Sequence, residues 1–179
     1  MTFAASAHSS SRTRTLVVIA LFVAISFVGS HIKVFGTIAF DSLPAFLAAL
    51  VLGPWYGAAI GFLGHMFTAL TSGFPLSVPL HFIIALAMAM TMLGFGYTYI
   101  ALKDKVSQAV NLTITGVAGV ILNAPFTLAL SMAALAFMAG SEAAMGLLIM
   151  LLPLTLAAAA NVIIAIAAFK VLARMWGKD

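Results

Sequence analysis

The sequence contains no cysteine and only four acidic residues. Without cysteine the chain can form no disulfide, no thiolate metal site and no thiol nucleophile. The scarcity of carboxylates leaves no acidic pair inside an apolar segment, which argues against aspartyl-type catalysis. H-E-x-x-H and G-x-S-x-G motifs are missing, as is a glycine-rich phosphate loop. We therefore predict a protein that is not an enzyme, with no catalytic residue, no metal ion and no cofactor.

Apolar residues dominate what is present. Hydrophobic residues make up 64% of the 179-residue chain and charged residues 7%, far outside the composition of soluble domains. A membrane-spanning helix needs roughly 20 residues, so the chain has room for about six. The predicted fold is an all-α integral membrane protein with a single six-transmembrane-helix bundle.

The boundaries of these helices follow from turn and cap residues. We expect a membrane domain over residues 15–174, with tails at 1–14 and 175–179. A helix beginning at Ser42 follows the capping residue Asp41 and ends at Gly53-Pro54. The expected spans are 15–30, 42–53, 55–71, 81–102, 106–139 and a last one from 145–153 to 174. Because 106–139 would exceed the bilayer thickness as one helix, we expect its part near 131–142 to bend or lie on the membrane surface.

The basic residues predict the orientation. Five of the eight Lys and Arg lie near the two ends of the chain, and Lys103 and Lys105 flank one short polar break. Cytoplasmic loops accumulate Lys and Arg, so both termini and this break are expected in the cytoplasm, with Lys33, Asp41, the turn SGFPLSVP (residues 72–79) and Glu142 outside. The chain is thus predicted to be a multi-pass protein of the cell's inner (plasma) membrane. Its positive charge suits anionic lipid heads and predicts no nucleic-acid partner.

Polar residues within the apolar segments are the candidate functional residues, because polar side chains inside a membrane often mark ligand paths. We predict that they converge, with residues of the external connectors, on one cavity open to the outside. The predicted set is Lys33, Asp41, His65, Phe74, His81, Asn123 and Asn161. Structural alternatives exist for several of them: His65 could bond a neighbouring carbonyl, Asp41 could simply cap a helix, and the two Asn could join helices.

The stretch TIAFDSLPAFLAALVLGPWYGAAIGFLGHMFTALTSGFPLSVPLHF resembles a known family, the substrate-binding S components of energy-coupling factor (ECF) vitamin transporters. The similar pattern is an aliphatic first span, a D-S-x-P helix start and L-A-A-L-x-L-G-P-x-x-G-A-x-x-G. Chain length and span number also agree with this family. The resemblance implies six membrane helices, cytoplasmic termini and tight capture of a vitamin or precursor from outside.

The resemblance also implies partners. S components dock on a transmembrane scaffold subunit that carries two ATPases, and they lie among membrane lipids. Docking in the family uses an A-x-x-x-A face on the first helix, which here falls on Ala20 and Ala24. Two alanines one turn apart allow close approach of another helix, although they could also serve packing within the bundle.

Within the family, H-M-F-T-A-L-T-S-G-F-P-L followed by P-L-H is most similar to the branch assigned to α-ribazole, a cobalamin precursor. The similarity lies at His65, Ser72–Pro75 and His81. Other neutral heteroaromatic vitamins (cobalamin, thiamine-like or riboflavin-like) would suit the same residues. The competing hypotheses are a membrane scaffold without a small ligand and, less favoured, a small metalloenzyme using His65 and His81. A channel is disfavoured because no charged ring or pore repeat is present.

Overall fold

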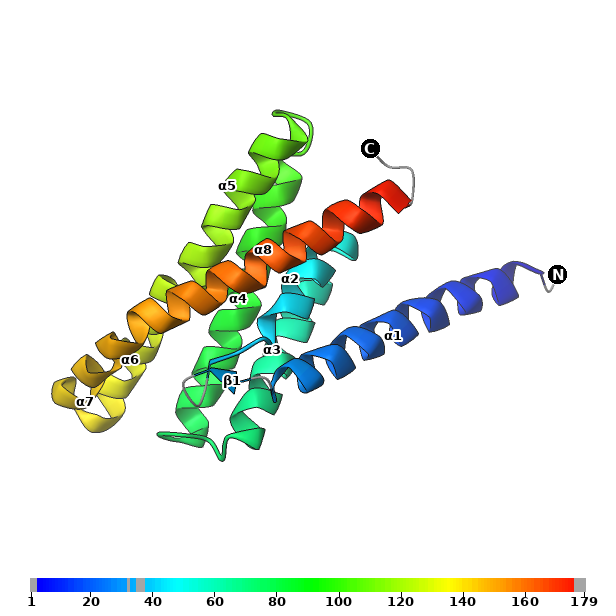
Figure 1. Cartoon of the computed structure of the whole chain (residues 1–179). Coiled ribbons are helices and arrows are strands. Elements are labelled where there is room, and N and C mark those ends of the chain that lie inside the picture. The colour runs from blue at the N-terminus through cyan, green and yellow to red at the C-terminus, as the bar shows by residue number, and fades with distance from the viewer. Residues whose placement is uncertain (1–2, 32, 35–37, 176–179) are drawn as a thin grey trace.

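The computed structural model describes residues 3–31, 33–34 and 38–175, with side chains described for 13, 15–31 and 40–175. Helices account for nearly all of this part of the chain (Figure 1). In order, the elements are α1 Phe3–Gly29, β1 Lys33–Val34, β2 Ile38–Ala39, α2 Ser42–Val51, α3 Pro54–Thr71, α4 Val78–Leu102, α5 Gln108–Ile121, η1 Leu122–Phe126, α6 Thr127–Ala139, α7 Ser141–Gly146, η2 Leu147–Met150 and α8 Leu151–Met175.

The first helix starts earlier than the sequence indicates. We expected a polar tail up to residue 14, but α1 begins at Phe3 and continues to Gly29. No glycine or proline occurs before Gly29, so nothing in the tail interrupts helical geometry. After α1, a ladder of two residues per strand pairs β1 with β2 in antiparallel register, Lys33 opposite Ala39.

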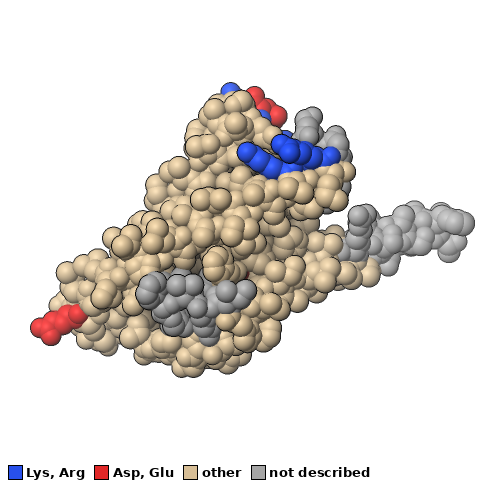
Figure 2. Space-filling view, viewed as in Figure 1, with Lys and Arg blue, Asp and Glu red and all other residues tan. Residues whose placement is uncertain are grey.

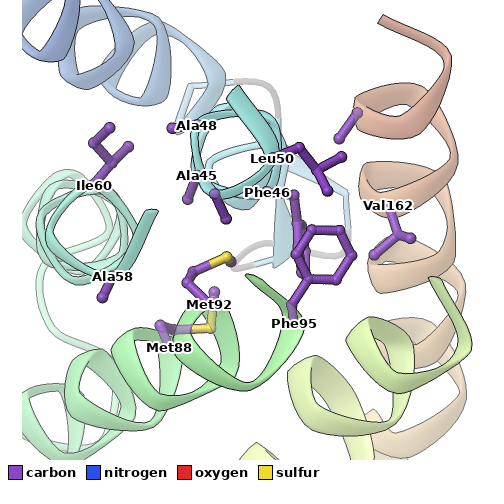
Figure 3. Close-up of a cluster of buried hydrophobic side chains, with 12 residues drawn as sticks. Ala45, Phe46, Ala48, Leu50, Ala58, Ile60, Met88, Met92, Phe95 and Val162 are labelled. Carbon is purple, nitrogen blue, oxygen red and sulfur yellow. The ribbon is translucent and has the colours of Figure 1, made fainter. Parts of the chain in front are cut away.

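Helix α2 is the centre of the molecule. At 10 residues it is about 15 Å long, too short to cross a bilayer core of roughly 30 Å. Most of its residues are buried, and it lies among α1, α3, α4 and α8. Figure 3 shows Phe46 of α2 next to Phe95 of α4, with ring centroids 4.8 Å apart in an edge-to-face arrangement. Val162 of α8 packs against the same core.

Glycines let the helices around α2 approach closely. A Cβ atom on Gly57 of α3 would lie 2.6 Å from the Cβ of Ala49 on α2. A Cβ on Gly96 of α4 would lie 2.9 Å from Pro54, at the start of α3. Both distances are below ordinary van der Waals contact, so the helices can take these positions only where the side chain is missing. The small residues therefore fix how α2, α3 and α4 pack.

The long segment after the basic break is interrupted at two places. We expected a bend near 131–142, and the helix ends within this range at Gly140, between Ala139 of α6 and Ser141 of α7. An earlier change, which we did not expect, lies at Leu122–Phe126, where η1 has π-helical geometry and contains Pro125. Proline cannot donate to an earlier carbonyl, and the wider π turn accommodates it. Regular helix then continues through 131 to Ala139, and the chain breaks at Gly140, whose φ is 92°.

The helix at the fourth expected span begins at Val78 rather than at His81. Ser77 caps it by accepting a hydrogen bond from the N–H of Leu80 at 3.2 Å. Pro79 then falls in the first turn, where proline is tolerated. We expected the turn SGFPLSVP to cover residues 72–79, whereas it ends at Ser77, because Val78 and Pro79 belong to the first turn of α4.

The all-helical prediction is confirmed, whereas the number of membrane spans remains a prediction. Three helical stretches of the described chain are long and apolar enough to cross a membrane: Val78–Leu102, Gln108–Ala139 and Ser141–Met175. Shorter apolar helices occur at Thr15–Gly29 and Ser42–Val51. Figure 2 shows that the described Lys and Arg side chains gather at one end of the molecule, while an acidic side chain projects at the opposite end.

Candidate functional site

A cavity of about 180 Å³ lies between the helices, lined by residues from Asp41 to Asn161. Its wall is built from the start of α2, the second half of α3, the loop before α4, the first half of α4, the η1–α6 segment, η2 and α8. Apolar side chains form most of the wall, and polar ones project into it from several helices. These polar lining residues are Asp41, Ser42, His65, Thr68, Ser72, His81, Asn123, Thr127, Ser131 and Asn161.

Asp41 is buried in this wall, with 6% of its surface exposed. We expected it in an external connector, with helix capping as an alternative role. It occupies the cap position of α2, yet its side chain makes no capping hydrogen bond. Instead the hydroxyl of Thr68 on α3 donates to Asp41 Oδ2 at 2.5 Å. Ser26 of α1 donates to the backbone carbonyl of Asp41 at 3.0 Å, so two neighbouring helices, α1 and α3, hold the residue at the start of α2.

His65 and His81 form a hydrogen-bonded pair across α3 and α4. His65 Nε2 lies 3.1 Å from His81 Nδ1, and the rings stack with centroids 5.3 Å apart. His81 Nε2 lies 2.8 Å from the carbonyl oxygen of Pro75. Because a carbonyl only accepts, His81 Nε2 carries the proton, and in a neutral ring Nδ1 is then an acceptor. His65 Nε2 therefore donates to His81, and the backbone fixes the direction of both bonds.

The loop between α3 and α4 closes one side of the cavity. Phe74 and Leu76 both have left-handed backbone conformations, with φ of 51° and 74°, which are uncommon for residues with side chains. Pro75 and Leu76 line the cavity. Phe74 does not line it, but its ring lies 6.0 Å from that of His81. The loop is thus attached to the site through His81.

The π-helical segment η1 positions Asn123 toward the cavity. The carbonyl of Leu122 accepts from Thr91 of α4 at 3.0 Å and from Thr127 at 2.9 Å. Threonine hydroxyls commonly satisfy the backbone groups that proline disturbs in membrane helices. Asn123 Nδ2 lies 3.2 Å from the sulfur of Met88. Since thioether sulfur only accepts, this contact fixes the orientation of the amide.

Five of the predicted residues meet in this cavity: Asp41, His65, His81, Asn123 and Asn161. Phe74 flanks it, and the side chain of Lys33 lies outside the described residues. Ala20 and Ala24 are exposed on α1. The structure therefore gathers residues up to 120 positions apart, from Asp41 to Asn161.

The sequence reasoning missed several polar residues of the wall, chiefly Thr68, Thr127 and Ser131. Helical spacing could have found them. Thr68 follows His65 by three residues, and Thr127 and Ser131 follow Asn123 at steps of four, so each shares a helix face with a predicted residue.

The site is suited to hydrogen bonding with an enclosed small molecule. In the described part of the chain, no group of three or more His, Cys, Asp and Glu side chains could hold a metal ion. The cavity is smaller than the roughly 300–1,000 Å³ of typical ligand pockets. Met88 and Met150 line it, and methionine side chains adapt easily to a change in the space they fill.

The chain matches the model of a known protein family. The model of the family described as "ECF transporter, substrate-specific component" matches residues 14–173. No curated protein and no solved structure matches the chain significantly. The matched stretch includes every residue that lines the cavity.

Proposed function

We propose, from the premise that the chain belongs to the family of substrate-specific components of ECF transporters, that it captures a vitamin or vitamin precursor in the cavity described above. Components of this family are transporter subunits and not enzymes. They bind small molecules and work with a membrane scaffold and ATPases. The proposal concerns which molecule is bound, where it is bound and how the chain meets its partners.

The observation that carries the proposed binding site is the convergence of Asp41, His65, His81, Asn123 and Asn161 on one cavity. Burying polar groups in an apolar bundle is costly unless they find partners. Five helical regions contribute such groups to the same small space, and a bundle that needed only packing would not require this. The arrangement therefore supports ligand binding over a purely structural role.

The preferred ligand is α-ribazole. Its support is the similarity of His65, Ser72–Pro75 and His81 to the α-ribazole branch, together with a wall that combines apolar surface and hydrogen-bonding groups. A benzimidazole riboside has a flat apolar base and a hydroxylated sugar, which need these two kinds of surface. Cobalamin, thiamine-like and riboflavin-like molecules are the alternative ligands.

The proposed topology places both termini and the Lys103–Lys105 loop in the cytoplasm, with six spans in the inner membrane. Its support is the gathering of the described basic side chains at one end (Figure 2) and the positive-inside rule. The cavity then opens toward the outside. Docking on the scaffold is proposed through Ala20 and Ala24, whose exposure on α1 leaves room for a closely packed partner helix.

The test of capture is mass spectrometry of small molecules released from the detergent-purified protein. We expect a stoichiometric α-ribazole, or another heteroaromatic vitamin, from protein made in cells that contain it. A blank that persists after incubation with a vitamin mixture would contradict capture and favour the scaffold hypothesis.

A further inference from the structure

We propose that a groove between α5 and α8 is a binding site for an anionic phospholipid, with one acyl chain in the groove and the lipid phosphate at Lys170. The groove is separate from the cavity described above, because the two share no lining residue among those that the structure describes. The inference therefore goes beyond the proposed function. It uses the proposed topology only to assign the lipid to the cytoplasmic leaflet.

The groove has a volume of about 630 Å³ and opens on the surface of the bundle. Val117 of α5 and Ile163 of α8 line it, and both are exposed. The two helices approach each other at Gly116, where an added Cβ would lie 3.1 Å from Ile166 Cδ1. Figure 1 shows that α5 and α8 run in opposite directions and spread apart toward the end that carries the C-terminus. The divergence of the helices keeps this space open.

The length of the groove corresponds to one leaflet of the membrane. On α8 its lining extends from Ala159 to Lys170, and on α5 from Ala109 to Ile121. At 1.5 Å per residue each stretch is about 17–18 Å long. One leaflet supplies about 15 Å of a hydrocarbon core of roughly 30 Å. The groove therefore has the length of a single acyl chain, whereas a partner helix that crosses the membrane would need contacts over about twice this depth.

The lining is suited to a hydrocarbon chain along most of its length. Aliphatic side chains dominate it, and the small residues Gly116, Ala159 and Ala167 give it depth. Inside a membrane the hydrophobic effect does not drive apolar surfaces together, so van der Waals packing decides which partner fits. A flexible chain can follow the divergent walls of the groove, but this contact alone would not distinguish one phospholipid from another.

A positive charge at one end of the groove supplies the distinction. Lys170 is exposed and is the one charged residue among the described residues that line the groove. Arg174 follows four residues later on the same face of α8 and is also exposed. Figure 2 shows that the described Lys and Arg side chains gather at one end of the molecule. In the proposed topology this end meets the cytoplasmic head groups, where basic pockets between membrane helices bind anionic lipids.

The head group that complements this end is a phosphate without a compensating ammonium group. The experiment is native mass spectrometry of the full-length protein in mild detergent, titrated with phosphatidylglycerol or with phosphatidylcholine of identical acyl chains. We expect the first phosphatidylglycerol to bind about fivefold more tightly or better, since each cation near the head groups contributes about that factor. Equal affinity for the two lipids would overturn the proposal.

Substitution of Lys170 tests the position of the phosphate. We expect Lys170→Gln to reduce the preference for phosphatidylglycerol by about fivefold and to leave the affinity for phosphatidylcholine unchanged. The matched control is Lys105→Gln, at an exposed cation outside the groove lining, which should keep the preference. An equal loss in the two variants would assign the preference to the general charge of this end and overturn the site.

Substitution of Ala167 tests the position of the acyl chain. Ala167→Phe fills the groove from an exposed position, and we expect it to weaken the first binding step for both lipids. Ala101→Phe is the matched control, because Ala101 is an exposed alanine of α4 outside the groove lining. Lipid affinities that stay the same in a folded Ala167→Phe protein would overturn the proposal. The midpoint of thermal unfolding verifies folding, and Lys170→Gln decides the question if Ala167→Phe does not fold.

A thiol in the groove distinguishes the lipid from a protein occupant. The chain has no cysteine, so Ala167→Cys carries a single thiol, and Ala101→Cys is its control. Under mild oxidation in native membranes, we expect no more disulfide-linked dimer from Ala167→Cys than from the control. An excess of dimer would place a second copy in the groove, and a specific cross-link to the scaffold subunit would place a partner helix there. Either result would overturn the lipid site.

The lipid measurements are independent of vitamin capture. They need no vitamin, and Lys170 and Ala167 do not line the cavity. Loss of the lipid preference would leave capture standing, and a protein that captures no vitamin would still show whether the groove selects an anionic lipid.

Discussion

At the level of a single residue, Thr68 links α3 to the start of α2 and supplies a hydrogen-bond donor to the buried side chain of Asp41. Its hydroxyl donates to Asp41 Oδ2 and is also 3.2 Å from the carbonyl of Gly64. The first contact joins α3 to the start of α2, where a buried carboxylate needs donors to be stable. Thr68 is itself buried, so water cannot replace the hydroxyl without entering the wall.

Replacing Thr68 with valine should reveal this dependence. We expect Thr68→Val to lower the free energy of unfolding by about 1–3 kcal/mol, because the Asp41 carboxylate loses a donor. Thermal or denaturant unfolding in detergent measures the change. Thr113→Val is the matched control, because Thr113 is exposed and its hydroxyl donates to the carbonyl of Ala109 in its own helix. Equal stability of the two variants would show that Asp41 does not rely on Thr68.

Individual cavity residues could be predicted from the sequence, but their pairing could not. Polarity within apolar segments was enough to select His65, His81, Asn123 and Asn161. The hydrogen bond between His65 and His81 depends on the relative depth of α3 and α4, which the loop Ser72–Ser77 determines. Asp41 was predicted in an external connector and in the cavity, but its hydrogen bonds to Ser26 of α1 and Thr68 of α3 could not be predicted, because they depend on how these helices pack.

At the level of elements, α2 and α3 pack closely against each other. The contact depends on Gly57, where an added Cβ would lie 2.6 Å from Ala49 Cβ and 3.0 Å from the carbonyl of Ala45. Neither neighbour is a flexible side chain end, so the helices themselves would have to separate.

Substitution of Gly57 tests this packing. We expect Gly57→Ala to destabilise the protein by about 1–3 kcal/mol, as overpacking typically does, with a lower midpoint of thermal unfolding. The matched control is Gly146→Ala at the end of α7, where an added Cβ has no neighbour within 4 Å. The control should be unchanged or slightly more stable. A stable Gly57→Ala protein would mean that α2 and α3 can separate without loss.

The positions of most helices followed from local signals, whereas their irregularities did not. Asp41-Ser42 and Gly53-Pro54 marked both ends of α2 correctly. The π-helical turn at Leu122–Phe126 was missed, because Pro125 alone does not tell whether a helix breaks, kinks or widens. The answer depends on Thr91 of another helix, which supplies a hydroxyl to the Leu122 carbonyl.

At the level of the whole molecule, the proposed orientation can be tested, because it places Lys105 in the cytoplasm and Glu142 outside. The chain has no cysteine, so single cysteines can be introduced without a background. Lys105 lies in the loop after α4 and Glu142 lies in α7, and both are exposed. We expect Lys105→Cys to react with a membrane-impermeant maleimide only after the cells are opened, and Glu142→Cys to react in intact cells. The reverse pattern would invert the proposed topology.

The proposed docking on the scaffold can be tested separately from ligand binding by substitutions on α1. We expect the double variant Ala20→Leu, Ala24→Leu to retain ligand affinity but to lose uptake, because bulky side chains block close helix approach. Ligand titration and cellular uptake measure the two properties. Leu16→Ala and Leu21→Ala, at exposed positions of α1, serve as controls. Loss of ligand affinity in the Ala20→Leu, Ala24→Leu protein would mean that Ala20 and Ala24 pack within the bundle and do not serve docking.

The bond between His81 and the carbonyl of Pro75 has a consequence for kinetics. Both nitrogens of this ring are engaged by protein atoms, so a ligand can contact only the ring face while the loop stays in place. The loop holds Pro75 between two left-handed residues, a conformation that other contacts must maintain. For the ligand proposed above, we expect the rate of release to depend on this internal bond of the protein. Substitution of His81 is then expected to change residence time and affinity separately.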